Sequence, residues 1–446
     1  MIFSDIREFF SFVKPKVVKR WFDVENLFCN YFWFYTVTAV IYLVFKQSSI
    51  FVLGLPLIIY LLFIKQKKCI KLNIVDILVL INIFWIGCTW ILNDFPHKFY
   101  IISRSLIGEI AFMIAYWIAR LGRKNYLGSI IENARKPLVI TCLLGLYCYF
   151  LEPAWYLNFL DSSISANTAG NYTKESVLDQ FKLRSIFSGG YTLGYLCAMA
   201  VIYELFCIFK YTNKQINYYN YRLLYILLLV ITSIFALMRA ALACSLMGLF
   251  LVYFYSVLYA KRIHSTKLLM HILGMLFVFV LIVLSCVDLS TIELLYSKFQ
   301  DISGNDGSFI RERLLMQANS FSLLGEGFGK YNAIVSYQFG MTSIPDGEYM
   351  KIIAEQGFVG LTITMLIFVL CLVKSVIYFK HLYFELFIVL MLLICMIGAD
   401  PLSTSDKHCI IYWLALGQIS NFKMNRNEKN KANRNVPAPI SSDTRK

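Results

Sequence analysis

The stretch Leu223–Tyr259, LLYILLLVITSIFALMRAALACSLMGLFLVYFYSVLY, decides how this chain folds, because it is almost wholly apolar and carries one charged residue, Arg239. As a single helix it would extend about 55 Å, which overshoots the ~30 Å hydrocarbon core of a bilayer. Basic residues flank it at both ends, at Arg222 and at Lys261. We therefore expect a membrane hairpin that turns at Arg239, at the outer face, and returns both ends to one side.

The composition of the whole chain indicates the same class of protein. Of 446 residues, 59% are hydrophobic and only 15% are charged, and the mean hydropathy is +0.63. A soluble domain could not bury that much apolar surface, so the sequence predicts an all-α, polytopic integral membrane protein. No small-residue cleavage site follows the first apolar run, so we expect that run to remain as a membrane helix.

About twelve apolar runs have roughly the length needed to cross the hydrocarbon core, although the second and the last are short. They lie near residues 28–45, 50–64, 74–92, 101–119, 137–152, 185–209, 223–238, 240–259, 268–287, 347–373, 382–399 and 408–421. The predicted transmembrane domain therefore covers residues 28–421, with a long connection between the ninth and tenth helices.

The basic residues indicate the orientation of these spans. When the connections are assigned alternately to the inside and the outside, most of the 42 lysine and arginine residues fall on inside segments, although the outside loops contain more residues. This positive-inside pattern predicts that both termini face the cytoplasm. The net charge of +15 is thus an orientation signal, and we expect no nucleic-acid partner.

The segments outside the spans have their own signatures. Residues 1–27 predict a basic amphipathic lead-in on the inner surface, and residues 422–446 a polar, disordered basic tail. Two outside loops, about 153–184 and about 288–346, are long enough to suggest a role. Neither contains a cysteine, so external disulfides are not expected, and no His/Cys cluster has metal-ligand spacing.

The longer outside loop is predicted to be partly helical. SFIRERLLMQANSF (residues 308–321) begins with Ser308 as an N-cap and has an apolar stripe, with Arg311 and Arg313 on opposite flanks of that stripe. The following LLGEGFGKY (residues 323–331) has glycine at every second position. No strand precedes it, so we interpret it as a flexible turn and not as a dinucleotide-binding fingerprint.

The mouth of the tenth span, PDGEYMKIIAEQGFVGL (residues 345–361), is rich in ionisable side chains. Asp346 is a predicted N-cap, and Glu348, Lys351 and Glu355 lie within about 60° of one another on the helix. They predict a polar stripe that descends about 10 Å into the bilayer. Two interpretations stay open: a Glu–Lys–Glu ladder that locks this helix to a neighbour, or a cavity that opens outward, as the arginines of the long loop favour.

Four arginines are expected at the same outer face, namely Arg184, Arg239, Arg311 and Arg313. A single arginine there is more often an anchor that snorkels to the interface than a ligand. Four that converge would suit a diphosphate, because the planar guanidinium binds phosphate oxygens in bidentate fashion and keeps its charge.

In the order and context of these segments, over about residues 180–375, the chain resembles the O-antigen polymerase (Wzy) and O-antigen ligase family of bacterial inner-membrane glycosyltransferases. LRSIFSGGYTLGYLCAM is similar to the family's arginine-led entry to a span, and ITSIFALMRAALACSLMGL to its arginine-containing span start. IRERLLMQANSFSLLGEGFG is similar to its loop helix and glycine-rich turn, and residues 345–361 to its polar helix mouth. Ligases typically carry a His-Asn pair where this chain has Asp346-Gly347, which favours a polymerase.

The resemblance implies an inner-membrane enzyme that joins undecaprenyl-pyrophosphate-linked oligosaccharide repeat units on the periplasmic face. A sugar hydroxyl of one glycan attacks the anomeric carbon of another, and polyprenyl pyrophosphate leaves. We hypothesise two sets of site residues: Asp346, Arg239 and Arg311 as catalytic, and Arg184, Arg313, Glu348 and Lys351 as substrate-binding. The arginines would neutralise the leaving group, and Asp346 or Glu348 would orient or deprotonate the acceptor.

No cofactor or metal is expected, since no outside loop carries an Asp-x-Asp pair. The expected partners are the lipid-linked glycans and the bilayer, together with a chain-length regulator and a flippase. Three alternatives remain: an O-antigen ligase, a transporter or flippase of lipid-linked oligosaccharides, and a non-catalytic partner in envelope assembly. A transporter would be expected to show repeat symmetry and charges near the membrane midplane.

Overall fold

The computed structural model describes the chain in residues 29–33, 36, 72–105, 111–122, 125–151, 153–156, 183, 185, 190–210, 216–236, 239–259, 274, 322–331, 347–398, 401–402 and 409–423. The regular secondary structure in these ranges is helical, and no strand occurs among them. The all-α prediction is therefore confirmed for the described part of the chain.

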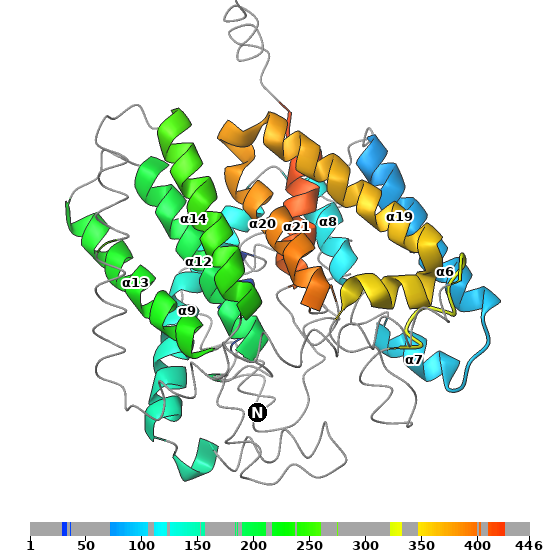
Figure 1. The fold of residues 1–446 in the computed structure, drawn as a ribbon, viewed down its shortest axis with the longest axis horizontal. Coiled ribbons are helices and arrows are strands. Elements are labelled where there is room, and N and C mark those ends of the chain that lie inside the picture. The colour runs from blue at the N-terminus through cyan, green and yellow to red at the C-terminus, as the bar shows by residue number, and fades with distance from the viewer. Residues whose placement is uncertain are drawn as a thin grey trace, which may run out of the picture.

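The described helices form a bundle in which most helices run between the same two ends (Figure 1). Their bounds are α6 (Ile74–Leu92), α7 (Lys98–Ser105), α8 (Ala111–Leu121), α9 (Tyr126–Leu151), α12 (Gly190–Lys210), α13 (Ile216–Phe235), α14 (Arg239–Tyr259), α19 (Glu348–Ile377), α20 (Phe379–Gly398) and α21 (Cys409–Asn421).

Within the described ranges, six helices are long and apolar enough to cross a membrane: α6, α9, α12, α14, α19 and α20. Large apolar side chains point away from the bundle, among them Phe84 (72% exposed), Leu246 (69%) and Ile397 (66%). Exposed apolar surface on long helices is what a hydrocarbon environment requires. These observations support a polytopic membrane protein.

The expected total of about twelve spans stays a prediction. The run near 50–64 lies outside the described residues, the run near 28–45 is described only at residues 29–33 and 36, and the run near 268–287 only at residue 274. The segments 1–27 and 424–446 and most of the loop 288–346 also lie outside them.

The run near 101–119 contains the end of α7 and most of α8, and residues 106–110 between them lie outside the described part of the chain. One span differs from its expected form. The run near 137–152 belongs to α9, which begins earlier, at Tyr126, and contains Pro137. Hydropathy places the start of that span after Arg135, but the helix includes this arginine because its Nε donates to the buried carboxylate of Glu204 in α12, at 2.5 Å.

The run Leu223–Tyr259 is divided where the sequence predicts. Helix α13 ends at Phe235, Ala236 lies in a turn, and α14 begins at Arg239. Both helices pack against α12, whose apolar window is almost completely buried. Helix α12 is therefore surrounded by protein, whereas α14 keeps an exposed apolar face.

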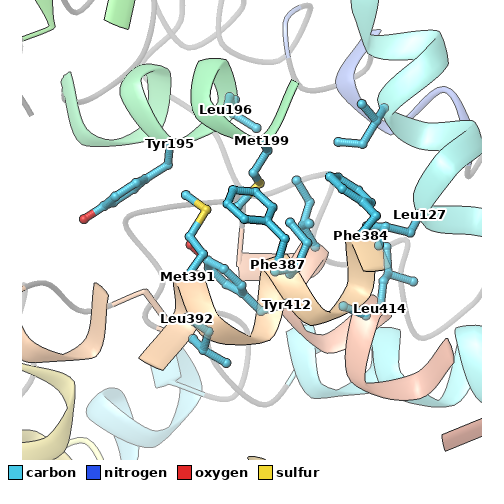
Figure 2. Close-up of a cluster of buried hydrophobic side chains, with 14 of the residues drawn as sticks. Leu127, Tyr195, Leu196, Met199, Phe384, Phe387, Met391, Leu392, Tyr412 and Leu414 are labelled. Carbon is cyan, nitrogen blue, oxygen red and sulfur yellow. The ribbon is translucent and has the colours of Figure 1, made fainter. Parts of the chain in front are cut away.

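The main apolar core extends through most of the described helices, and Figure 2 shows the part of it between α12, α20 and α21. Phe387 and Met391 of α20 point toward Tyr195 and Met199 of α12, with Tyr412 of α21 beside them. All five side chains are no more than 1% exposed. This interlocked packing joins the two halves of the described bundle.

Helices α8 and α21 approach each other closely. A Cβ atom on Gly417 of α21 would lie 2.2 Å from the carbonyl oxygen of Tyr116 in α8. Only glycine allows this distance between backbones, and small residues serve the same purpose in other membrane helix pairs.

A buried ion pair joins the start of α6 to the end of α8. Arg120 Nε lies 2.9 Å from Asp76 Oδ1 and 3.0 Å from Oδ2. The Tyr116 hydroxyl donates to the same carboxylate at 2.6 Å, and the backbone N–H of Asn73 donates to it at 2.8 Å. Asp76 is fully buried and Arg120 is 8% exposed, so these contacts replace water as partners of the charges.

The ends of α19 and α21 belong to the same cluster. The Ser420 hydroxyl accepts from Asn73 Nδ2 at 2.8 Å, and its carbonyl oxygen accepts from Lys374 Nζ at 3.0 Å. The start of α6 and the ends of α8, α19 and α21 therefore meet at one end of the bundle, which we call the Asp76 end. The positive-inside pattern assigns all four of these helix ends to one side, in agreement with these contacts.

The ends of α12 and α14 also lie at the Asp76 end. Tyr259 at the end of α14 and Phe379 at the start of α20 have ring centroids 6.0 Å apart. Tyr383 of α20 lies 4.6 Å from Tyr255 of α14 and 4.4 Å from Phe206 of α12. Because α20 starts directly after α19 ends, the beginnings of α14 and α19 lie at the opposite end of the bundle (Figure 1).

Candidate functional site

The structure describes only part of the predicted site. Glu348 and Lys351 are described with their side chains, both in α19. Arg239 begins α14, but its side chain lies outside the described part, as do the whole residues Arg184, Arg311, Arg313 and Asp346. The four-arginine set and the Asp346 mouth therefore stay predictions, and the site is built below from what surrounds them.

Helix α19 is broken, which corrects the expectation of one continuous span from its mouth to its end. Gly357 has φ 71° and ψ −177°, so the chain leaves the helical conformation there. The residues before it form a short arm, Glu348–Gln356, and the residues after it a long apolar arm that ends at Ile377. The predicted polar stripe belongs to the short arm alone and does not continue down the membrane-spanning arm.

The break exposes backbone carbonyls that a continuous helix would have used, and the glycine-rich turn of residues 322–331 binds them. The backbone N–H of Glu326 donates to Ala354 O at 2.8 Å, and that of Gly327 donates to Glu355 O at 3.0 Å. In the other direction the N–H of Val359 donates to Leu323 O at 3.3 Å. Each partner thus supplies the hydrogen bonds that the other lacks.

A third donor binds a backbone carbonyl at the break. Trp85 of α6 donates its indole Nε1–H to the carbonyl oxygen of Gln356 at 2.8 Å. Helix α6, the turn of residues 322–331 and the bend of α19 are therefore held together (Figure 1).

Glycine is required on both sides of this contact. A Cβ atom on Gly357 would lie 2.2 Å from Leu323 O, and one on Gly325 would lie 2.5 Å from Glu355 O. Both residues also have positive φ, 71° and 81°, which other L-residues adopt only at a cost. The interpretation of residues 323–331 as a flexible turn is therefore wrong, because the turn is bonded into α19.

The charged side chains of the short arm are buried, with Glu348, Lys351 and Glu355 only 3%, 2% and 1% exposed. Glu348 Oε2 accepts from the backbone N–H of Leu402 at 3.2 Å, and Glu355 Oε1 accepts from that of Tyr331 at 3.0 Å. The two acids thus tie the arm to the segment after α20 and to the glycine-rich turn. These contacts favour the first of the two open interpretations, a helix locked to its neighbours.

The far end of the turn carries an ion pair that the sequence analysis missed. The Glu326 carboxylate accepts hydrogen bonds from Lys330 Nζ and from the Tyr331 hydroxyl. Partial burial raises the pKa of Glu326, but these two hydrogen bonds lower it by more, so the pKa lies below its ordinary value. The i,i+4 spacing of Glu326 and Lys330 was the available sequence signal.

The backbone on both sides of position 184 is anchored next to the α13–α14 turn. The N–H of Leu183 donates to Phe235 O, the last residue of α13, at 3.0 Å. Ser185 Oγ donates to Thr141 O of α9 at 2.7 Å, and Ser185 has φ 55°, a left-handed conformation that is uncommon for serine. Leu183 therefore lies close to the turn that leads from α13 into α14.

The sequence analysis predicts that the start of α14 and the mouth of α19 contribute to one site. In the structure both helix starts lie at one end of the bundle, opposite the Asp76 end. Among the described residues, no group of three or more His, Cys, Asp and Glu side chains could hold a metal ion.

Comparison with known proteins leaves the family open: no family model matches the chain, and no curated protein and no solved structure is found to be similar to it.

Proposed function

We propose that this chain is a surface-polysaccharide polymerase of the O-antigen polymerase type, a membrane glycosyltransferase that joins undecaprenyl-pyrophosphate-linked repeat units. The resemblance described above is the source of this proposal, and the implied setting is the periplasmic face of a bacterial inner membrane. The product would be a longer lipid-linked glycan and free polyprenyl pyrophosphate.

The observation that carries the proposal is the attachment of the glycine-rich turn to the break in α19. This turn follows the segment that contains Arg311 and Arg313 in the sequence, and Glu348 at the mouth of α19 directly follows Asp346-Gly347. The hydrogen bonds at the break attach the turn, which follows the arginine-bearing segment in the sequence, to the helix that begins two residues after the proposed base. This attachment supports the proposal that the two sequence segments cooperate.

In the proposed mechanism, arginines bind the two diphosphates and neutralise the charge that grows on the leaving group. Arg239 would act from the start of α14 and Arg311 from the long loop, with Arg184 and Arg313 in support. Asp346 would accept the proton of the acceptor hydroxyl. Glu348, whose carboxylate accepts a hydrogen bond from the backbone N–H of Leu402, would hold the mouth in place. Lys351 would lie about one helical turn further along the same arm.

The break in α19 also bears on a second candidate, a transporter of lipid-linked oligosaccharides. Transporters commonly use helices that are broken inside the membrane, with unwound carbonyls that bind the substrate or a coupling ion. In α19 the carbonyls of Ala354, Glu355 and Gln356 accept hydrogen bonds from Glu326, Gly327 and Trp85. Their occupation by protein donors makes the break a joint between elements and weakens the transporter interpretation.

The test is synthesis of polymer by the purified protein in liposomes that contain lipid-linked repeat units, without nucleotide sugar, ATP or an ion gradient. We expect polymer from the wild type and a loss of tenfold or more for Arg239→Lys and Arg311→Lys, since lysine lacks the planar fork. Lys423→Gln, at the Asp76 end, is the matched control. Full-length polymer at the wild-type rate from both lysine variants contradicts the arginine site.

The same assay examines Asp346 and the ligase alternative. Asp346→Ala is expected to abolish polymer, and an unchanged rate with an unchanged pH profile would leave Asp346 a helix cap only. In cells that lack the protein, accumulation of a single lipid-linked repeat supports a polymerase. Accumulation of long, unattached chains would indicate a ligase instead.

A further inference from the structure

A pocket of about 630 Å³ lies between α9 and α13, beside Trp33. The site proposed above makes no use of it. Its lining includes three cationic residues, Arg135, Lys136 and Arg222, and three aromatic residues, Trp33, Tyr221 and Tyr225. The remaining lining is aliphatic. The pocket thus combines a cationic region with apolar walls, which is the chemistry of a site for an anionic amphiphile.

The described residues neutralise only part of the positive charge of the pocket. The fully buried carboxylate of Glu204 in α12 binds both guanidinium groups, Arg135 Nε and Arg222 Nη1, at 2.5 Å each. Glu132 lies 4.0 Å from Arg135 Nη2. Lys136 is exposed at the rim and adds a third cation, so among the described residues three positive charges face two negative ones.

Two buried polar groups at the pocket have no hydrogen-bond partner within the described part of the chain. They are Nη2 of Arg135 and the hydroxyl of Tyr225. Both can donate hydrogen bonds, and buried donors are normally satisfied. A phosphate group has several acceptor oxygens and can accept hydrogen bonds from donors of this kind.

The position of the pocket suits a lipid of one leaflet. Its ion pairs join α9 and α13 to Glu204, near the end of α12 that lies at the Asp76 end. Tyr221, at its rim, is 78% exposed, and Ile140 in its apolar wall is 51% exposed. An acyl chain could therefore enter sideways from the bilayer while the headgroup stays at the level of the cations.

We propose that this pocket binds the headgroup phosphate of an anionic phospholipid from the leaflet at the Asp76 end. The positive-inside pattern assigns that leaflet to the cytoplasmic side. Arg135 and Lys136 contact the phosphate, Tyr225 donates a hydrogen bond to it, and the apolar wall of α9 contacts an acyl chain. The bound lipid would link α9 to α13 on the lipid-facing side of Glu204. This inference does not depend on the proposed enzymatic function.

The experiment uses the full-length protein in a neutral detergent. Dioctanoyl phosphatidylglycerol, dioctanoyl phosphatidylcholine or inorganic phosphate is titrated, and the apparent dissociation constant is taken from the rise in melting temperature. We expect a saturable rise with phosphatidylglycerol alone. Phosphatidylcholine tests the need for net negative charge, and inorganic phosphate tests the need for the acyl chains.

Two variants locate the binding site. Lys136→Gln removes an exposed charge without touching the Glu204 ion pairs and is expected to weaken phosphatidylglycerol binding about fivefold. Tyr225→Phe removes one hydroxyl and keeps the ring, and it should also weaken binding. The matched control is Lys380→Gln, an exposed lysine at the start of α20 at the same end of the bundle, which should leave the dissociation constant unchanged.

Three results would each overturn the proposal. Equal binding of phosphatidylglycerol and phosphatidylcholine would show that the net negative charge of the headgroup is not needed for binding. Saturable binding of inorganic phosphate in the same concentration range would indicate a free anion as the ligand. Equal losses for Lys136→Gln and Lys380→Gln would indicate general attraction to the detergent-bound lipid instead of a defined site.

Discussion

Gly357 shows how one residue can decide the shape of a membrane helix. Its φ of 71° ends the short arm of α19, and the lack of a side chain lets the carbonyl of Leu323 approach the backbone. The sequence shows a glycine within a long apolar run, which is compatible with an unbroken helix. The close approach of another chain segment is what makes glycine necessary here.

We expect Gly357→Ala to destabilise the protein. Alanine at this φ costs about 1–2 kcal/mol, and its Cβ would displace the glycine-rich turn. Melting of the purified protein in detergent should show a decrease of several degrees. Gly87→Ala is the matched control, because a Cβ on this helical glycine of α6 meets nothing within 4 Å and alanine favours the helix.

The comparison between the two glycine variants decides the outcome. An equal melting temperature for Gly357→Ala and wild type would mean that the turn is not attached to α19 as described. A similar decrease for Gly87→Ala would mean that any added methyl group destabilises the protein, and the argument from the break would fail.

At the scale of elements, hydropathy locates apolar runs but not the contacts that extend or divide them. Helix α9 continues through Arg135 because this side chain forms an ion pair with Glu204. Helix α19 breaks because the turn of residues 322–331 offers an alternative set of hydrogen bonds. In both cases the residue that forms the contact lies far away in the sequence, so a local sequence pattern cannot predict it.

The buried ion pair between Asp76 of α6 and Arg120 of α8, which we call the Asp76–Arg120 clamp, gives a prediction at this scale. Asp76→Asn removes the charge that neutralises buried Arg120, and breaking a buried pair costs about 3–5 kcal/mol. We expect a large decrease in melting temperature for Asp76→Asn. Asp94→Asn, an exposed aspartate beyond the other end of α6, should change it little.

The double variant Asp76→Asn/Arg120→Met separates a lost ion pair from lost packing. Replacement of both charges by neutral groups is often close to neutral, so the double variant should recover much of the stability that Asp76→Asn loses. A double variant that is less stable than the single variant would contradict the clamp.

At the scale of the whole molecule, the described helices define two distinct ends. The Asp76 end collects the start of α6 and the ends of α8, α12, α14, α19 and α21. The opposite end collects the beginnings of α14 and α19, which are the segments to which the proposed function assigns Arg239 and the mouth. The proposed catalysis therefore requires that the two ends face different compartments.

Thiol labelling in intact cells tests this requirement. Single cysteines at positions 239 and 311 should react with a membrane-impermeant reagent from outside the inner membrane. Cysteines at positions 380 and 423 should react only after permeabilisation. Ten native cysteines are described as free, nine of them buried, so their background should be low in the folded protein. Protection of position 239 or 311 until permeabilisation would rule out the proposed site.

The sequence by itself determined the class of protein, the division of Leu223–Tyr259 at Arg239 and the location of most spans described here. These features follow from the hydrophobic cost of exposing apolar side chains and from chain length, both of which are local. The tertiary structure alone decided the break at Gly357, the attachment of the glycine-rich turn, the Asp76–Arg120 clamp and the pocket beside Glu204. Each of these depends on hydrogen bonds or ion pairs between residues distant in sequence, and only the folded chain brings such partners within reach.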